Sequence, residues 1–477
     1  MRPGFDLAGK RVLVVGLART GVAAALFSAG YGAIVTATDV KPEAELGDAA
    51  GKLRAAGVTL ELGAHAPVTF SGLDLIIVSP GVPAKLPFLE LARTHGIPVW
   101  SEVELAWRFL RGKLVAITGS NGKTTTTSLV AHILETAKIP TLVGGNIGTP
   151  LLARVEASMD TTVTVAEISS FQLETIDAFR PEIGVLLNLT PDHLDRHETF
   201  EAYAAAKIRM FENQLERDIA ILNADDPEVT RRMPPRPHIY WFSRQKRVAE
   251  GAFLVDGQIV FRTEGSEIPL LRREDIPLKG EHNVENVLAA CAASYLAGAD
   301  AASIANGVKT FEGVEHRLEF VREIGDVAFY NDSKATNVDA TLKAIEAFPG
   351  SLIVILGGKD KGSSYAGLRE PLRERARLVL LIGAAAEKIA SELGDVVPTE
   401  RAGTMDRAVE TAFNIAKPGD VVLLAPACAS FDQFDNYEHR GRVFKELVAK
   451  LERAQAAGNS RSAAADIPRE KGRNDAS

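Results

Sequence analysis

Cysteine and long apolar runs are scarce in this sequence. Two cysteines, Cys291 and Cys428, occur in 477 residues, and they form neither a disulfide framework nor the spacing of a metal site. We expect both to be small buried side chains in a reducing cytosol. No apolar stretch approaches the ~20 residues of a membrane helix, and residues 1–7 lack the apolar run of a signal peptide. These absences predict a cytoplasmic protein that does not insert into membranes.

An excess of basic residues is also absent. The chain has 54 Lys and Arg against 62 Asp and Glu, for a formal net charge of −8. This balance gives no electrostatic reason to expect nucleic acid or an anionic membrane as a partner. Small anionic ligands would therefore need local basic sites.

The chain is too long for one hydrophobic core, and usual domain sizes predict roughly three domains. Apolar strands alternate with helical segments, which predicts an α/β fold with mostly parallel sheets. We expect a Rossmann-like domain at 1–112, a central P-loop ATPase-type domain with a small antiparallel addition at 113–312, and a Rossmann-like domain at 313–453. Residues 454–477 have the composition of a disordered tail.

A phosphate-binding loop is the clearest motif. Residues 113–127 predict a short strand, a glycine turn and the start of a helix that carries Lys123 and Thr124. Such a turn directs backbone N–H groups and the positive end of the helix dipole at an anion. Ile117 stands where the general P-loop pattern has its first glycine. The alternative, a glycine turn without a ligand, explains less of this arrangement.

The first domain carries a second glycine turn. A strand at 11–16 leads into Gly16–Gly21, and a strand at 33–38 ends at Asp39. This order is typical of a nucleotide site, with the turn facing a phosphate and the acid facing a sugar hydroxyl. Because Ala18 replaces a glycine of the dinucleotide fingerprint, we favour a nucleotide-containing ligand over a redox dinucleotide. A purely structural glycine turn remains the alternative.

Polar groups follow several strands of the central domain. Glu167 ends an apolar strand beside the P-loop, which is the usual place of a second magnesium anchor. The loop at 190–197 contains His193 and indicates metal or phosphate chemistry, although a polar surface loop would explain it equally well. Asn283 and Asn286 lie one helical turn apart and either line a ligand pocket or cap a helix. An Asp-Gly hairpin is expected within 253–261.

Three strand ends of the last domain carry charged or hydroxyl residues. They lead into 331–337, 357–362 and 426–434. Because ligands collect at the carboxyl ends of strands in open α/β sheets, we expect these three loops to form one cleft rim.

In order and spacing, the motifs together resemble the Mur ligases of peptidoglycan synthesis. The matching segments are 118–125, 144–148, 167–173, 188–197, 280–286, 316–319, 331–337 and 426–434. Within this family they are most similar to the member that adds D-glutamate to UDP-N-acetylmuramoyl-L-alanine. The resemblance spans residues ~10 to ~450, and so many ordered motifs are more specific than any single one.

The resemblance implies an ATP-dependent ligase that forms an amide bond through an acyl phosphate. The substrate carboxylate would first take the γ-phosphoryl group of ATP, and the amine of D-glutamate would then displace phosphate. It also implies two magnesium ions and a carbamylated Lys207, because a free lysine repels a cation whereas a carbamate offers oxygens. The unmodified alternative for Lys207 is a solvated helix lysine. We expect a monomer.

The resemblance also assigns site residues by position. Residues that contact ATP are Gly119, Ser120, Asn121, Gly122, Lys123, Thr124, Thr125, Asn283, Asn286, Arg317 and Asp332. Magnesium ligands are Thr124, Glu167, His193 and Lys207. Residues that contact the UDP-substrate are Ala18, Arg19, Thr20, Asp39, Lys41, Ser79, Gly81, Asn146 and Gln172. Residues that hold the amino acid are Lys334, Thr336, Lys361, Ser430 and Phe431. The catalytic group would be Lys123, Glu167, His193, Lys207 and Lys334.

Two features depart from the family pattern. Ala18 and Arg19 stand where small or hydroxyl residues are expected, and Lys41 stands where an arginine would pair with phosphate in a bidentate manner. Both concern recognition of the uridine nucleotide.

Rival interpretations come from three classes. A sister ligase for another amino acid is disfavoured by the segments 331–337 and 426–434. A P-loop switch or binding protein would leave Glu167, His193 and Lys207 without a role. A redox enzyme is disfavoured by Ala18 and by the P-loop.

Overall fold

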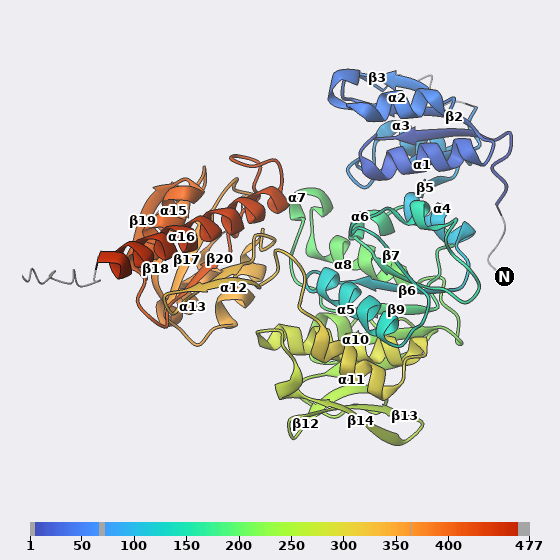
Figure 1. Cartoon of the computed structure of the whole chain (residues 1–477). Coiled ribbons are helices and arrows are strands. Elements are labelled where there is room, and N and C mark those ends of the chain that lie inside the picture. Colours follow the sequence, from blue (N-terminus) through green and yellow to red (C-terminus); the bar gives the residue numbers. More distant parts are fainter. Residues whose placement is uncertain (1–4, 66–71, 363, 466–477) are drawn as a thin grey trace, which may run out of the picture. The chain divides into compact units, whose positions relative to one another are not determined.

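The computed structural model describes residues 5–65, 72–362 and 364–465 (Figure 1). The chain divides into two compact units, Met1–Glu312 and Gly313–Ser477, and each is described by itself. Within the described residues, no helix combines the length and the apolar character needed to cross a membrane.

The first unit opens with a five-stranded parallel sheet in the order β3-β2-β1-β4-β5. Its strands are β1 (Arg11–Val15), β2 (Ile34–Asp39), β3 (Thr59–Leu62), β4 (Leu75–Val78) and β5 (Val99–Ser101). Its helices are α1 (Arg19–Gly30), η1 (Glu43–Glu45), α2 (Asp48–Ala55), α3 (Pro87–Thr94) and α4 (Glu102–Phe109). The strand order reverses between β1 and β4, so the turns after these two strands border the crevice where ligands bind in such sheets.

A nine-stranded sheet follows in the order β14-β13-β12-β11-β10-β9-β6-β8-β7. Its strands are β6 (Lys113–Thr118), β7 (Thr141–Gly145), β8 (Val163–Glu167), β9 (Ile183–Leu186), β10 (Ile219–Asn223), β11 (His238–Ser243), β12 (Gly251–Val255), β13 (Gln258–Thr263) and β14 (Ser266–Arg272). β6, β8 and β9 are buried almost throughout, as expected of central strands covered on both faces.

The expected antiparallel addition is confirmed as the edge of this same sheet. β12 pairs in parallel with β11, whereas β12, β13 and β14 pair antiparallel. The expected hairpin is also confirmed, because Asp256 and Gly257 join β12 to β13 with φ of 50° and 72°. Two consecutive left-handed residues give the turn twist that suits a two-residue hairpin.

Helices cover the central sheet on both faces and carry much of the candidate site. They are α5 (Lys123–Thr136), η3 (Leu151–Arg154), α6 (Ser170–Leu173), α7 (Leu194–His197), α8 (Phe200–Ile208), η4 (Arg209–Phe211), α9 (Pro227–Thr230), η5 (Arg273–Asp275), α10 (Glu281–Ala297) and α11 (Ala301–Thr310). One hydrophobic core runs from the first sheet into the central one, so the two sheets share a single compact unit.

The second unit is a six-stranded mixed sheet in the order β15-β16-β20-β17-β18-β19, with β15 antiparallel at one edge. Its strands are β15 (Glu319–Ile324), β16 (Val327–Asn331), β17 (Leu352–Gly357), β18 (Ala376–Ile382), β19 (Thr399–Gly403) and β20 (Val421–Leu424). Its helices are α12 (Val338–Glu346), η6 (Ala366–Leu368), α13 (Arg369–Arg375), α14 (Ala386–Leu393), α15 (Met405–Ile415) and α16 (Tyr437–Ala465).

Alternate residues of β17 enter two different cores. Val354 and Leu356 pack with α12, α13 and α14, whereas Ile353 and Ile355 pack with α15 and α16. The sheet is therefore covered on both faces, and the α/β fold class is confirmed. α16 continues to Ala465, past the start of the tail expected at residue 454, and residues 466–477 lie outside the described part. Its alanines are strong helix formers.

Candidate active site

The P-loop is formed by the turn between β6 and α5. Gly119 has φ of 151° and Gly122 has φ of 83°. A methyl group at Gly119 would lie 2.9 Å from Cβ of Leu187, and one at Gly122 would lie 2.2 Å from Oδ1 of Asn286. Both glycines are therefore required by backbone angle and by space.

The loop after β9 holds this turn in place. Asn121 N–H donates to Oδ1 of Asn188 (2.8 Å), and the Asn188 amide donates back to the Asn121 carbonyl (3.1 Å). The Ser120 hydroxyl donates to the Thr190 carbonyl and accepts from the Tyr203 hydroxyl, both at 2.9 Å. Tyr203 was not among the predicted site residues, because it comes next to the P-loop only when the chain folds.

The P-loop lysine folds back over its own loop. Lys123 Nζ donates to the carbonyls of Gly119 (2.8 Å) and Ser120 (2.7 Å). Thr124 and Thr125 follow on the first turn of α5, where both are buried. A lysine and a hydroxyl at a helix N-terminus suit phosphate oxygens and a bridging cation.

Lys207 lies fully buried beneath the same loop. Its Nζ donates to the Gly119 carbonyl (2.8 Å) and lies 4.8 Å from the centre of the Tyr203 ring. Burial lowers the pKa of Lys207 well below its usual value; the charge of Lys123 lowers it further, while Asp192 and Glu167 oppose this. The site therefore shifts Lys207 toward the neutral amine.

Glu167 and Asn146 meet at the ends of β8 and β7. The Asn146 side-chain amide donates to Oε1 of Glu167 (2.8 Å), and Asn146 N–H donates to the Glu167 carbonyl (2.8 Å). Glu167 is 1% exposed. A buried carboxylate beside a P-loop is a suitable oxygen ligand for magnesium.

His193 is placed at the loop that enters α7. It has a left-handed backbone (φ 52°), its ring lies against Phe171, and its Nε2 lies 3.7 Å from Oδ2 of Asp192. His197 lies instead inside the structure, where it contacts the Ser170 hydroxyl (3.0 Å) and burial lowers its pKa.

Asn286 and Asn283 line the side of the P-loop from α10. The Asn286 amide donates to Oδ1 of Asn283 (3.0 Å), and Oδ1 of Asn286 accepts a long bond from the Thr126 hydroxyl (3.4 Å). Both asparagines are buried, so they help to hold α10 against α5.

Most of the predicted UDP-substrate residues lie at the ends of three strands of the first sheet, β1, β2 and β4. The Ser79 hydroxyl donates to the Gly16 carbonyl (2.8 Å), so the turns after β1 and β4 touch. Asp39 accepts from the N–H groups of Leu17 (2.5 Å) and Lys41 (2.9 Å), which commits its carboxylate to the backbone. Gly81 and the Lys41 side chain are exposed.

The start of α1 reaches the central sheet. Ala18 is the N-cap of α1, Thr20 is half-buried, and the Arg19 guanidinium donates to the Gly148 carbonyl. Gly148 belongs to the same loop as Asn146, so these predicted residues are brought together. Gln172 is buried, and its Oε1 accepts from the Ser169 N–H in the capping box of α6.

Arg196 ties the turn after β4 to the loop that carries His193. Its guanidinium donates to the carbonyls of Pro80 and Val82 and to Oε2 of Glu174 (3.0 Å). It also lies 4.2 Å from the centre of the Phe171 ring. Sequence reasoning missed Arg196, because its partners are far away along the chain.

In the second unit, the three predicted strand-end loops are joined. β16, β20 and β17 are adjacent in the sheet. Ala427 N–H donates to the Ala335 carbonyl, and Lys359 pairs with Ala429. The Lys361 ammonium lies 3.5 Å from the Thr336 hydroxyl. Ser430, which directly follows Ala429, is buried. The three loops are therefore adjacent, as predicted, and their role as the rim of a ligand cleft stays a prediction.

Two side chains at this rim were not predicted. The Lys334 ammonium lies 5.1 Å from the centre of the Tyr437 ring, whereas the predicted Phe431 is 68% exposed. The fully buried Arg440 donates to the Ser333 carbonyl (2.7 Å) and the Cys428 carbonyl (3.1 Å). The two unpredicted side chains are therefore Tyr437 and Arg440. Both belong to α16, and only folding brings this helix next to the loops.

Asp332 and Arg317 are electrostatically linked in this unit. Burial raises the pKa of Asp332 to about 7, and the charges of Arg317 and Lys334 act in the opposite direction. The four predicted nucleotide residues outside the P-loop therefore fall in both units, with Asn283 and Asn286 in the first and Arg317 and Asp332 in the second.

The donor set fits a cation that is shared with phosphate. No group of three or more His, Cys, Asp and Glu side chains in the described residues has the arrangement of a metal site. Magnesium is commonly held by one or two carboxylates together with phosphates and water. The Thr124 hydroxyl and the Glu167 carboxylate suit that mode.

Three family models match successive parts of the chain. They are described as the Mur ligase MurD-like N-terminal domain (residues 10–101), the Mur ligase middle domain (117–294) and the Mur ligase glutamate ligase domain (316–428).

Two curated relatives are named UDP-N-acetylmuramoylalanine–D-glutamate ligase. The one from Acidobacterium capsulatum is 55% identical over 459 residues, covering 96% of this chain and 100% of the relative. The one from Solibacter usitatus is 56% identical over 449 residues, covering 94% and 99%.

Solved structures resemble the chain at lower identity. A pseudomurein peptide ligase type C from Methanothermus fervidus has a TM-score of 0.58 at 20% identity, covering 93% of this chain and 100% of that one. A UDP-N-acetylmuramate-alanine ligase from Thermotoga maritima has a TM-score of 0.57 at 19% identity, covering 94% and 100%. These likenesses show the fold alone.

Proposed function

This chain belongs to the Mur ligase family, and from that premise we propose that it joins D-glutamate to UDP-N-acetylmuramoyl-L-alanine in peptidoglycan precursor synthesis. The observation that carries the proposal is the identity of 55% and 56% to two ligases of that name, over at least 94% of this chain. The site geometry supports the chemistry.

The reaction couples amide formation to ATP. A carboxylate oxygen of the UDP-substrate attacks the γ-phosphorus, and the bond from that phosphorus to ADP breaks. The D-glutamate amine then attacks the acyl carbon, loses a proton, and expels inorganic phosphate. The protein positions the reactants and neutralises the charge that develops on the phosphoryl oxygens.

The P-loop residues would bind the phosphates of ATP. Lys123 supplies the positive charge, and the N–H groups at the start of α5 face the anion. Thr124 and Glu167 would hold one magnesium ion, which supplies charge neutralisation when bound. Asn283, Asn286, Arg317 and Asp332 are the other residues that we propose as nucleotide contacts.

A second magnesium ion would be held by His193 and by Lys207 as a carbamate. The neutral Lys207 amine adds to carbon dioxide, forms an N–C bond and releases one proton, which leaves a carboxylate-like group. The buried position supports this step, because burial favours the unprotonated amine. Intact-mass analysis under mild conditions and a carbamate carbon resonance in ¹³CO₂ would test it.

The remaining assignments follow the two sets of loops. The first-sheet turns with Ala18, Arg19, Thr20, Asp39, Lys41, Ser79 and Gly81, together with Asn146 and Gln172, would bind the UDP-substrate. Lys334, Thr336, Lys361, Ser430 and Phe431 would hold D-glutamate, whose two carboxylates suit two lysines. We propose domains at 1–112, 113–312 and 313–453, with the UDP-substrate residues in the first two and the D-glutamate residues in the third. We further propose that one cytoplasmic chain performs the reaction.

The decisive experiment measures phosphate release from ATP by the purified chain with UDP-N-acetylmuramoyl-L-alanine. D-glutamate, L-glutamate, L-alanine and no amino acid are compared, and the product is weighed by mass spectrometry. We expect release with D-glutamate alone and a product heavier by one glutamyl residue. Release with a different amino acid would move the chain to a sister reaction, and no release at all would contradict a ligase.

A further inference from the structure

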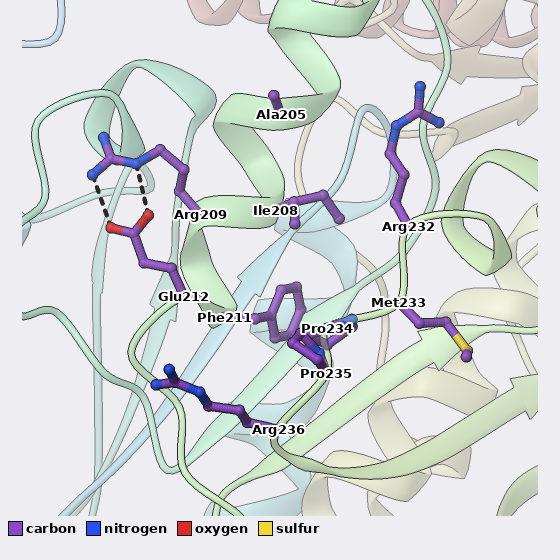
Figure 2. A pocket seen from close by; sticks show the side chains of 10 residues that line it. All are labelled: Ala205, Ile208, Arg209, Phe211, Glu212, Arg232, Met233, Pro234, Pro235 and Arg236. Atoms are coloured by element: carbon purple, nitrogen blue, oxygen red, sulfur yellow. Dashed lines mark hydrogen bonds and ion pairs between the residues drawn. The ribbon is translucent and has the colours of Figure 1, made fainter.

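A cavity of about 520 Å³ lies on the central domain beside α8, at residues that no step of the proposed reaction uses (Figure 2). Its lining residues are Ala205, Ile208, Arg209, Phe211, Glu212, Arg232, Met233, Pro234, Pro235 and Arg236. Figure 2 shows Ile208, Phe211 and the two prolines in the middle of this group, with Arg209, Glu212 and Arg236 to one side. The volume and the mostly apolar lining are those of a small-molecule site.

The cavity and the candidate active site use different faces of α8. Tyr203 and Lys207 point inward, where both are buried and contact the P-loop region. Ala205 and Ile208, one helical turn apart, face the cavity instead. A ligand in the cavity would therefore not compete with ATP for the same side chains.

The arginines around the cavity differ in whether their charge is already paired. Arg209 pairs with Glu212 (2.8 Å) and donates to the Leu173 carbonyl (2.9 Å). Arg232 pairs with Glu228 and lies 5.5 Å from the centre of the Phe200 ring. Within the part of the chain that the structure describes, no ion pair or hydrogen bond is formed by the exposed Arg236. Because Arg209 and Arg232 are paired with Glu212 and Glu228, the positive excess at the cavity comes from Arg236.

We propose that this cavity binds a small amphipathic anion, with an aromatic or branched apolar body and one carboxylate. The apolar body would pack on Ile208, Phe211 and Pro234, and the carboxylate would accept from the Arg236 guanidinium. Apolar burial supplies most of the binding free energy, while the charge-assisted hydrogen bonds select an anion over a neutral molecule. The proposal is independent of the proposed ligase reaction.

The test uses matched probes with the full chain. Binding of 2-naphthoate, 2-naphthalenemethanol and 2-naphthylmethylammonium is followed by saturation-transfer NMR and calorimetry, with a non-hydrolysable ATP analogue and magnesium present to fill the nucleotide site. We expect naphthoate to bind about three- to tenfold more tightly than the alcohol, and the ammonium compound to bind weakest. Equal affinities, or no binding of naphthoate, would overturn the proposal.

Variants locate the bound probe. Arg236→Gln should reduce naphthoate affinity to that of the alcohol, and Arg236→Lys should retain part of the preference. Arg231→Gln is the matched control, because Arg231 is an exposed arginine of the same segment that does not line the cavity. Ile208→Ala should weaken naphthoate and the alcohol alike. Equal effects of Arg236→Gln and Arg231→Gln would place the probe elsewhere and overturn the assignment.

Discussion

Single buried titratable residues at the candidate site favour unusual protonation states. Lys207 is buried under the P-loop with a lowered pKa, and Asp332 is buried in the second unit with a pKa raised to about 7. A group whose pKa differs between the folded and unfolded chain makes stability depend on pH. Both residues therefore give predictions that need no substrate.

Asp332→Asn tests the raised carboxyl pKa. Between its usual pKa and about 7, the folded chain binds more protons at Asp332 than the unfolded chain does. The stabilising contribution of Asp332 is therefore lost as pH rises through this window. We expect the Tm of Asp332→Asn, relative to the Tm of the parent chain, to rise from about pH 5 to about pH 8. A difference that does not change with pH would contradict the raised pKa.

Lys207→Met tests the lowered amine pKa. Here the unfolded chain binds more protons between the lowered folded pKa and the usual lysine value, so stability rises with pH in that window. In buffer depleted of carbon dioxide, we expect the Tm of the parent chain, relative to the Tm of Lys207→Met, to rise from about pH 6 to about pH 9. Lys113→Met, at a half-buried lysine of β6, is the control for the loss of one lysine side chain. An unchanged difference in Tm between the parent chain and Lys207→Met would contradict the lowered pKa.

At the scale of elements, short helices act as connectors between segments distant in sequence. α7 contributes Arg196, which binds the turn after β4. α4 contributes two buried glutamates: Glu104 accepts from the N–H groups of Asp177 (2.9 Å) and Phe179 (2.7 Å), and Glu102 accepts from that of Leu152 (2.6 Å). The loops that surround the candidate site are held by such single side chains.

Arg196→Lys should loosen the substrate turn while keeping the charge. A lysine cannot reach two carbonyls and Glu174 together, because it lacks the planar fork. We expect KM for the UDP-substrate to rise about five- to tenfold, with a smaller change in KM for D-glutamate. Arg93→Lys is the control, since Arg93 donates to the nearby Ala84 carbonyl (2.9 Å). Equal rises for both substrates would indicate a general loss of structure.

Glu104→Gln should destabilise the first unit by about 2–4 kcal/mol, because the buried Phe179 N–H, the Asp177 N–H and Arg108 lose one of the two carboxylate oxygens that accept from them. Glu102→Gln is the contrast: burial raises the pKa of Glu102 to about 7, so a neutral side chain is already favoured there. We expect it to cost less than about 1 kcal/mol below pH 7. Urea unfolding followed by tryptophan fluorescence would compare them, since Trp107 lies on α4.

At the scale of the whole molecule, the chain segment at the boundary of the two units exposes more side chains than the segment near residue 112. Glu312 and Glu315 are exposed, whereas Leu110 is 4% exposed and a methyl group at Gly112 would lie 2.1 Å from the Thr162 carbonyl. We therefore expect limited subtilisin digestion to cut first between residues 310 and 317 and to release a stable fragment of residues 1–312. A first cut between residues 109 and 114 would contradict this.

Local patterns predicted the fold class well, because buried strands, glycine turns and helix starts are encoded within a few residues. The P-loop, Glu167 and the Asp-Gly hairpin were found in this way. Tyr203, Arg196, Tyr437 and Arg440 were missed, since their partners come from distant segments. Tyr437 illustrates the limit: its ring lies 5.1 Å from the Lys334 ammonium, although the two residues are more than 100 positions apart in the sequence. The ligand roles remain predictions.

The hairpin between β12 and β13 has a practical consequence. Its exposed Asp256 and Gly257 belong to an edge addition of the central sheet, and neither is among the candidate site residues. Exposed hairpin tips tolerate inserted sequence. A short peptide tag or a single fluorophore attachment site placed there would mark the central domain without altering any candidate site residue.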